Sequence, residues 1–165
     1  MTHNLGLLVE NFQKWGRIYR VEADITATTL PSGWKLVFLF SQDPGCCQVG
    51  QKIPAVYIKS KSGSGGKGVI GVFSAISGQG NVGIESPLID VGTKYNLVVQ
   101  QFEEEDAVMY TIELNGVTIH SVENTEAKDF LNVKVITGDA SEYGILENFK
   151  YSGAKGKYQI FFRQL

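Results

Sequence analysis

The chain has 165 residues, 43% of them hydrophobic, and a formal net charge of -2 at pH 7. A chain of this length buries roughly 70% of the surface that its unfolded form exposes, so residues 1–165 are expected to form a single domain. The acidic balance excludes a polycationic composition and argues against nucleic acid as the main partner. No run of about 18 apolar residues occurs, so no membrane span is expected. Residues 1–10 lack the basic region and the long apolar region of a signal peptide, so no signal peptide is expected.

Alternating hydrophobic and polar residues predict strands along most of the chain. A short apolar run at residues 5–9 is followed by a long alternating strand at residues 17–28. Residues 34–40 are apolar on both faces apart from Lys35, which is typical of a central strand. Pro54 is expected at the beginning of its strand or on a sheet edge, because proline cannot donate a ladder hydrogen bond.

The second half of the chain continues the same pattern, and the stretch from residue 124 to residue 129 is too short for more than one helical turn. Short strands without an internal repeat predict an all-β fold, a two-sheet antiparallel β-sandwich of jelly-roll type. The further strands are expected at residues 53–59, 69–76, 82–85, 95–102, 131–137, 145–151 and 158–162.

The clearest local signal is a hairpin at residues 108–122, where Asn115-Gly116 separates two alternating segments. Asn-Gly tolerates the positive φ angles of a type I′ turn, whose twist matches that of the strands it joins. A continuous register from this turn places Ile112 opposite Ile119, Tyr110 opposite Ser121, and Thr111 opposite His120. His120 is therefore expected on the solvated face.

The C-terminal segment, residues 158–165, is apolar on one face and partly apolar on the other. Leaving its aromatic and aliphatic side chains in water would cost a large part of the stability of the domain, so it must pair with a sheet. It is expected beside residues 5–9 of its own chain, because chain termini often lie close together. The alternative is a sheet edge of a second copy, which would make this an assembling protein.

Seven segments of the chain form a recognisable succession of motifs. They are WGRIYRVEAD (15–24), KIPAVY (52–57), SAISGQGN (74–81), IELN (112–115), HSVENT (120–125), FLNVKV (130–135) and GILENFKY (144–151). Taken in this order, they resemble the succession found in concanavalin A-like, laminin-G-like jelly-roll domains of secreted invertebrate proteins, a lectin- and glucanase-type sandwich. The resemblance implies a secreted, extracellular jelly roll and suggests binding of a glycan or an extracellular matrix ligand. The chain departs from such domains at residues 138–143, where they often carry an aromatic, proline-rich sequence.

Glu22 and Asp24 are the first candidates for chemistry. Two carboxylates at this spacing lie on the same face of a strand about 6–7 Å apart, a distance that glycosidases use. Sandwich-fold glucanases carry a similar motif but add a second glutamate, and here residues 25–27 are Ile, Thr and Ala. The pair is therefore interpreted as part of a solvated strand face, and the chain is expected not to be an enzyme.

No metal or cofactor is expected. The acidic cluster at residues 103–106 lacks the interleaved spacing of a calcium loop and is interpreted as an exposed turn. His3 and His120 are too far apart in sequence and too unaccompanied for a zinc motif. Cys46 and Cys47 are adjacent, so they cannot cross-link the domain internally and are either free or paired between chains.

A carbohydrate site needs an aromatic platform for the apolar face of a sugar and polar groups for its hydroxyls. The favoured function is a non-catalytic extracellular recognition module, lectin-like and capable of forming a homo-oligomer. The alternatives are a structural or self-assembling protein and a degenerate glycosidase-like enzyme. The ligand contacts proposed from the sequence are Arg20, Glu22, Asp24, Trp34, Asn96, Gln100 and His120.

Overall fold

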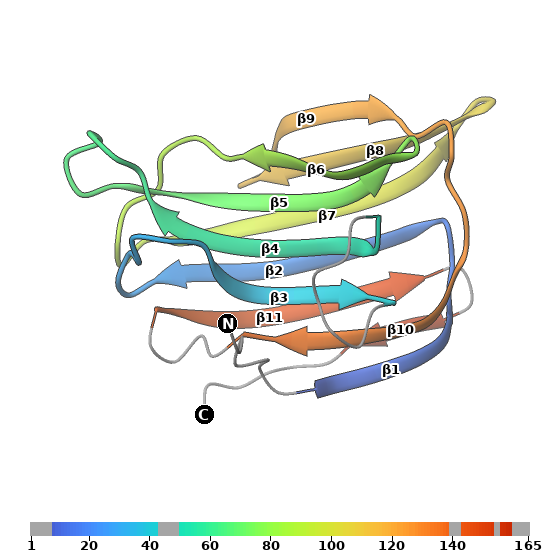
Figure 1. The fold of residues 1–165 in the computed structure, drawn as a ribbon, viewed down its shortest axis with the longest axis horizontal. Helices are drawn as coiled ribbons and strands as arrows, with labels where there is room; N and C mark the ends of the chain where they lie inside the picture. Colours follow the sequence, from blue (N-terminus) through green and yellow to red (C-terminus); the bar gives the residue numbers. More distant parts are fainter. Residues whose placement is uncertain (1–7, 43–49, 139–142, 154–155, 160–165) are drawn as a thin grey trace.

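The structure, a computed structural model, describes residues 8–42, 50–138, 143–153 and 156–159. These residues form strands β1 to β12 and no helix. The strands make two six-stranded antiparallel sheets that lie one behind the other as the layers of a sandwich (Figure 1). The all-β jelly-roll sandwich expected from the sequence is confirmed. No helix of the described ranges is long and apolar enough to cross a membrane.

The strand order in each sheet determines which side chains share an outer face. Sheet A runs, in spatial order, β1 (Leu8–Trp15), β10 (Phe130–Thr137), β3 (Lys35–Ser41), β4 (Lys52–Ser60), β5 (Gly68–Ile76) and β6 (Gln79–Glu85). Sheet B runs β12 (Gly156–Gln159), β11 (Gly144–Gly153), β2 (Tyr19–Ala27), β7 (Lys94–Glu104), β8 (Ala107–Leu114) and β9 (Val117–Glu123).

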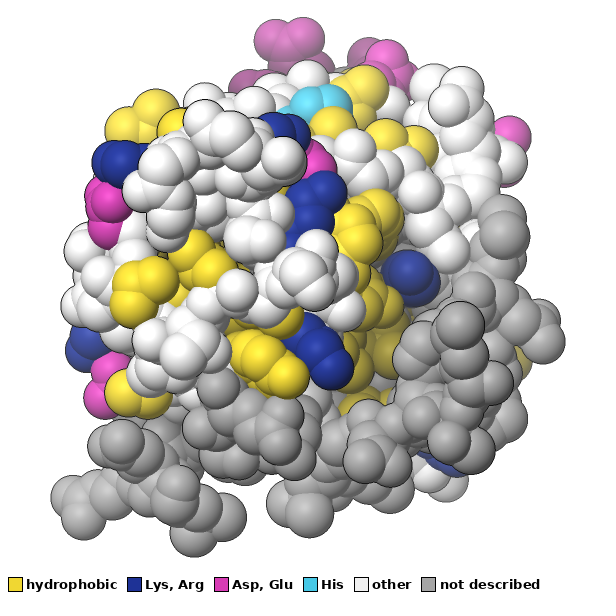
Figure 2. Space-filling model, turned by 60° about the vertical axis from the view of Figure 1, so that its left-hand side comes forward, with side chains coloured by type: hydrophobic (Ala, Val, Ile, Leu, Met, Phe, Trp, Pro, Cys, Tyr) yellow, Lys and Arg dark blue, Asp and Glu magenta, His cyan; other side chains and the backbone are white. Residues whose placement is uncertain are grey.

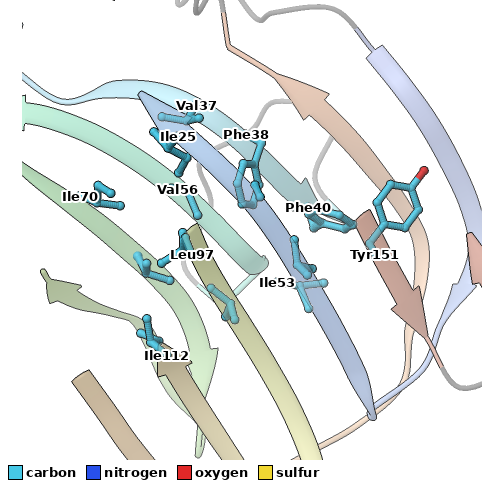
Figure 3. Close-up of a cluster of buried hydrophobic side chains, with 14 of the residues drawn as sticks. Ile25, Val37, Phe38, Phe40, Ile53, Val56, Ile70, Leu97, Ile112 and Tyr151 are labelled. Carbon is cyan, nitrogen blue, oxygen red and sulfur yellow. The ribbon is translucent and has the colours of Figure 1, made fainter. Parts of the chain in front are cut away.

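The hydrophobic core fills the space between the inner faces of the two sheets (Figure 3). Alternation in β2 places Val21, Ala23 and Ile25 there with at most 1% of each side chain exposed. The side chains labelled in Figure 3, among them Phe40 from β3 and Leu97 from β7, lie in this space. The inward-facing residues predicted for β2 are thus confirmed. In a sheet that is covered on one face, every second side chain of a strand is buried against the core.

Strand β3 occupies the interior of sheet A, between β10 and β4, as its apolar sequence predicted. Phe38 and Phe40 belong to the main core, while Leu39 packs with Ala55 and Ile136 in a second cluster. Pro54 does not lie on an edge, since β4 has a neighbour on each side. It is the third residue of β4 and lies where the pairing of β3 with β4 changes register, so the ladder is already interrupted there.

The β8–β9 hairpin has the predicted turn but not the predicted register. Leu114 pairs with Val117, and Asn115 and Gly116 have φ angles of 50° and 75°. The register then shifts, so Ile112 faces His120, not Ile119. The same shift pairs Tyr110 with Val122 and Thr111 with Ser121. The extra residue of a β-bulge is invisible to a strict two-residue alternation, which explains the error.

Both terminal strands pair differently from the prediction. The N-terminal strand extends to Trp15 and pairs with β10, and β12 pairs with β11. The expected pairing of the C-terminal segment with the N-terminal strand is therefore wrong for Tyr158 and Gln159, the two residues of that segment within the described ranges. Its partner is nevertheless a strand of the same chain.

Candidate functional site

The outer face of sheet B carries a continuous set of polar side chains, here called the polar array. Alternation puts Arg20, Glu22 and Asp24 of β2 on this face, because Val21, Ala23 and Ile25 face the core. The register pairs Arg20 with Gln100 and Asp24 with Asn96 on the adjacent strand β7. The array consists of Arg20, Glu22, Asp24, Asn96, Gln100, Glu113, Asn148 and Lys150.

One half of the polar array is centred on Gln100. The Arg20 guanidinium donates to Gln100 Oε1 at 2.7 Å, and Gln100 Nε2 donates to Glu113 Oε1 at 3.3 Å. Arg20 also donates to Glu22 Oε2 at 3.3 Å, and Lys150 Nζ lies 4.0 Å from Glu22 Oε1. Two cations and two carboxylates therefore alternate across neighbouring strands, with an amide between them.

The other half of the polar array is centred on Asp24. Asn96 Nδ2 donates to Asp24 Oδ1 at 2.9 Å and reaches Glu22 Oε1 at 3.5 Å. Asn148 Nδ2 donates to Asp24 Oδ2 at 2.7 Å. Asn148 has a φ of 49° at a bulge in β11, between the pairs made by Glu147 and Lys150. The bulge brings this amide to the face of the sheet, as bulges commonly re-aim side chains.

The hydrogen bonds fix the charge on Asp24. Partial burial raises the pKa of this carboxyl, but the hydrogen bonds from Asn96 and Asn148 and the nearby charges of Lys94 and Lys150 outweigh that effect and lower the pKa below its ordinary value. Val98, which also lies on this face, is only 3% exposed because longer neighbours cover it. Asp24 is thus held as a carboxylate within a pre-ordered set of hydrogen-bond donors and acceptors.

The lowered pKa of Asp24 predicts an acid-sensitive contribution to stability. A carboxyl whose folded pKa lies below its unfolded value, about 3.9 for aspartate, stabilises the fold above that value and loses this effect as pH falls through the folded pKa. We expect Asp24→Asn to flatten the dependence of the free energy of unfolding on pH below about pH 4. Urea denaturation at a series of pH values measures it. The control is Asp106→Asn in the exposed β7–β8 turn, which should keep a pH dependence of the free energy of unfolding close to that of the unchanged protein. The prediction is contradicted if Asp24→Asn also keeps the pH dependence of the unchanged protein.

Two residues predicted as ligand contacts do not belong to the polar array. Trp34 precedes β3 in sheet A and packs on that sheet against Tyr57 and Phe73. His120 is not on the solvated face opposite Thr111, because the bulge in the hairpin pairs it with the buried Ile112. Its ring lies 6.3 Å from that of Tyr110, and its Nε2 atom is buried without a hydrogen-bond partner in the described part of the chain.

Three members of the polar array were not predicted from the sequence. Glu113 follows from the alternation of β8 and could have been found by extending the register from Gln100 to the next strand. Asn148 and Lys150 are placed by the bulge in β11, for which the alternation of the sequence gives no signal. The array also shows that the predicted Asn96 and Gln100 lie directly beside the predicted residues of β2.

The remaining predicted features lie elsewhere. The acidic segment 103–106 forms the exposed end of the β7–β8 hairpin, where Glu103 pairs with Arg17 at 2.6 Å. In the described ranges, no group of three or more His, Cys, Asp or Glu side chains is placed to hold a metal ion. Cys46, Cys47 and His3 lie outside the described residues.

Comparison with known proteins places the chain by its fold. No protein-family model matches it, and no curated protein sequence matches it at a significant level. The heptameric SAP-like pentraxin from Limulus polyphemus is 14% identical, with a TM-score of 0.58 over 92% of this chain and 71% of the pentraxin chain. Alginate lyase A1-II′, of polysaccharide lyase family 7, is 13% identical, with a TM-score of 0.56 over 93% of this chain and 74% of the lyase chain.

A further alginate lyase, from Alteromonas sp. 272, is 15% identical, with a TM-score of 0.52 over 83% of this chain. This chain spans 56% of that lyase's length. At such identities the similarity shows the fold, and it is the concanavalin A-like jelly roll that the sequence resemblance implied. The fold is one that carbohydrate-related proteins use.

The expectation, from the sequence, that the chain is not an enzyme is wrong. It rested on the absence of a second glutamate after Asp24, which concerns one reaction class only. Several solved structures with this fold are alginate lyases, so the fold is one that enzymes use for a different reaction on a polysaccharide. An incomplete glucanase motif therefore gives no ground for calling this sandwich catalytically inactive.

Proposed function

We propose that the protein binds carbohydrate through the polar array on sheet B. The observation that carries this proposal is the convergence of Arg20, Glu22, Asp24, Asn96 and Gln100 in one hydrogen-bonded network on an outer sheet face. Five of the seven residues selected from the sequence as sugar contacts thus lie on one face of the adjacent strands β2 and β7.

The chemistry of the array suits vicinal hydroxyl groups. A sugar hydroxyl donates one hydrogen bond and accepts others, and the array offers carboxylate acceptors beside amide and guanidinium donors. Hydrogen bonds to charged groups contribute more than those between neutral groups, about 1.5–3 kcal/mol each. Because neighbouring members already hold one another in place, little side-chain entropy is lost when a ligand binds.

A glycan array probed with the full chain tests the proposal, followed by titration of the glycans that bind. Gln100→Ala removes the amide that joins Arg20 to Glu113 and should weaken binding by at least about tenfold, equivalent to about 1.4 kcal/mol. The matched control is Gln79→Ala, an exposed glutamine at the start of β6 in the other sheet, which should bind as the unchanged protein does.

The same samples are assayed for released reducing ends, because solved structures of this fold include polysaccharide lyases. Cleavage that is lost with binding in Gln100→Ala would assign a reaction to the same face. The proposal fails if no glycan binds, or if Gln100→Ala and Gln79→Ala behave alike.

An extracellular location and a homo-oligomeric state are also part of the proposal. The oligomeric state is supported by the heptameric pentraxin that shares this fold. Light scattering over a range of protein concentrations, with and without the bound glycan, measures it. Assembly without any glycan binding would favour the structural or self-assembling alternative instead.

A further inference from the structure

A second group of side chains lies on the opposite side of the molecule, on the outer face of sheet A. Trp34, Tyr57 and Phe73 contact one another edge to face, with ring centroids 5.4 Å apart for Trp34–Phe73 and Tyr57–Phe73 and 6.4 Å apart for Trp34–Tyr57. Lys52 and Lys59 lie over these rings. We call these five residues the aromatic-lysine patch.

The sheet beneath the patch is built to receive large rings. Tyr57 pairs with Gly71, and Phe73 pairs with Gly83 and with Ala55, so each ring lies beside a residue with little or no side chain. A Cβ atom added at Gly71 would lie 2.4 Å from the Trp34 ring, and one added at Gly83 would lie 2.5 Å from the Phe73 ring. The rings therefore lie close against the backbone.

Packing alone does not account for the patch. Leu39, Ala55 and Ile136 of the same outer face are buried, whereas Trp34, Tyr57 and Phe73 remain partly exposed. No helix in the described part of the chain covers this sheet. The space-filling view shows hydrophobic side chains exposed next to basic ones near the centre of the surface (Figure 2). Partly exposed aromatic rings beside cations are typical of a recognition surface.

The two lysines of the patch differ in their partners. Lys59 Nζ lies 4.1 Å from the centroid of the Trp34 ring and pairs with Glu85 at 2.8 Å, a carboxylate that Lys61 also contacts at 2.5 Å. Lys52 Nζ lies 5.1 Å from the centroids of both Tyr57 and Phe73 and has no carboxylate partner among the residues that the structure describes. Burial also lowers the pKa of Lys52, so its cation would gain from an incoming anion.

We propose that the aromatic-lysine patch binds a sugar unit that carries an anionic group, with the apolar face of the ring against the aromatic side chains and the anion on Lys52. Aromatic rings bind the C–H groups of a pyranose, and a lysine ammonium pairs with a carboxylate or sulfate. Charge repulsion disfavours a symmetric contact of this patch with its own copy, because that contact would place the unpaired Lys52 near the lysines of the second copy. The ligand is thus an acidic oligosaccharide, bound on the face opposite the polar array.

Tryptophan fluorescence of the full chain reports this binding directly. The chain has two tryptophans, and Trp15 is 2% exposed, so a change on titration arises at Trp34. The probes are a hexagalacturonate, which carries carboxylates, a sulfated dextran oligosaccharide, and the neutral cellohexaose. We expect the acidic probes to bind, with affinity falling as salt rises, and the neutral probe to bind at least about tenfold more weakly. The stronger of the two acidic probes identifies the anionic group.

Two substitutions test the two halves of the patch. Lys52→Met keeps an unbranched side chain and removes the charge, and Gly71→Ala displaces the end of the Trp34 ring without touching Lys52. Each should weaken binding of the acidic probe at least about tenfold. The controls are Lys67→Met, a lysine paired with Asp90 in a loop, and Gly33→Ala, where an added Cβ meets no atom within 4 Å. Both should bind as the unchanged protein does.

The proposal is overturned if the neutral probe binds as well as the acidic ones, or if Lys52→Met binds unchanged. It is also overturned if poly-glutamate displaces the acidic sugar at equal charge concentration, since the patch would then be a site for an acidic polypeptide. Gln100→Ala should leave this binding unchanged. Failure at one face is therefore distinguishable from failure of the proposed function at the other.

Discussion

Replacing Phe40 with alanine should lower the free energy of unfolding by about 3–5 kcal/mol. The side chain is fully buried between the sheets. Its ring centroid lies 4.9 Å from that of Trp15, 5.4 Å from that of Tyr151 and 6.0 Å from that of Phe149. These neighbours come from β1 and β11, so the ring joins both sheets. Truncation removes its burial free energy and leaves a cavity that large, mutually packed rings fill poorly.

Such a loss is a large part of the ~5–15 kcal/mol that stabilises a typical domain. For a chain of this size, each kcal/mol lowers the melting temperature by roughly 2–4 °C, so a decrease of about 6–20 °C is expected. Thermal and urea denaturation measure it. Leu131→Ala is the control, because Leu131 is 58% exposed on β10, and it should change stability by less than about 0.5 kcal/mol. If the free energy of unfolding of Phe40→Ala were within about 1 kcal/mol of that of the unchanged protein, Phe40 would not be part of a close-packed core.

The position of Phe40 illustrates what could be predicted from the sequence. In strands with one solvent-exposed face, such as β2, the alternation of the sequence predicts which residues face the core, since each inward position must be apolar. The sequence of β3 predicts a position in the interior of its sheet, because it is apolar on both faces. In agreement with this, Leu39 belongs to the second hydrophobic cluster, on the outer face of sheet A. These two signals were sufficient to predict the sandwich, the inward-facing residues of β2 and the interior position of β3.

What alternation could not predict is the position of the bulges. One extra residue near Ile119 reverses the faces of the rest of β9, which turns His120 from the solvated face to the side of Ile112. A bulge in β11 brings Asn148 to Asp24. Both follow from local backbone conformations whose free energy depends on packing across the sheet, and a single strand's sequence does not contain that information.

The candidate sites, too, could be predicted only in part from the sequence. Arg20, Glu22 and Asp24 could be grouped from the sequence because they share one strand, but their neighbours Asn96 and Gln100 required the order of the strands. Trp34 was assigned to the same ligand, whereas the structure places it on the other sheet with Tyr57 and Phe73. Residues on opposite outer faces of a sandwich cannot touch one small ligand, because the core separates them by about 10 Å of packed side chains. Sheet membership therefore decides which polar and aromatic residues form one site.

The second large effect is expected at the Asn115-Gly116 turn, which lies beside the polar array. Both residues have positive φ angles, 50° and 75°, the conformation of a type I′ turn. Asn115 also anchors the turn to β7, since its Oδ1 atom accepts a hydrogen bond from the backbone N–H of Asn96 at 2.8 Å. Its own N–H donates to Asn96 O, also at 2.8 Å. The turn thus holds the backbone of a residue of the proposed carbohydrate site.

Exchange of Asn115-Gly116 for Val-Val should therefore cost about 3–7 kcal/mol. A β-branched residue at positive φ stores roughly 1–3 kcal/mol of strain at each of the two positions, and loss of the Asn115 side chain removes a hydrogen bond that contributes about 1 kcal/mol. Asn115→Asp is the matched control, because Asp-Gly tolerates the same turn and keeps an oxygen acceptor, so its melting temperature should stay close to that of the unchanged protein. If Val-Val melted like the Asp-Gly variant, the strands would not be joined by this turn. If Val-Val folds at low temperature, its glycan binding should be weaker than its folded fraction predicts, since the exchange removes the side-chain hydrogen bond that holds the backbone of Asn96.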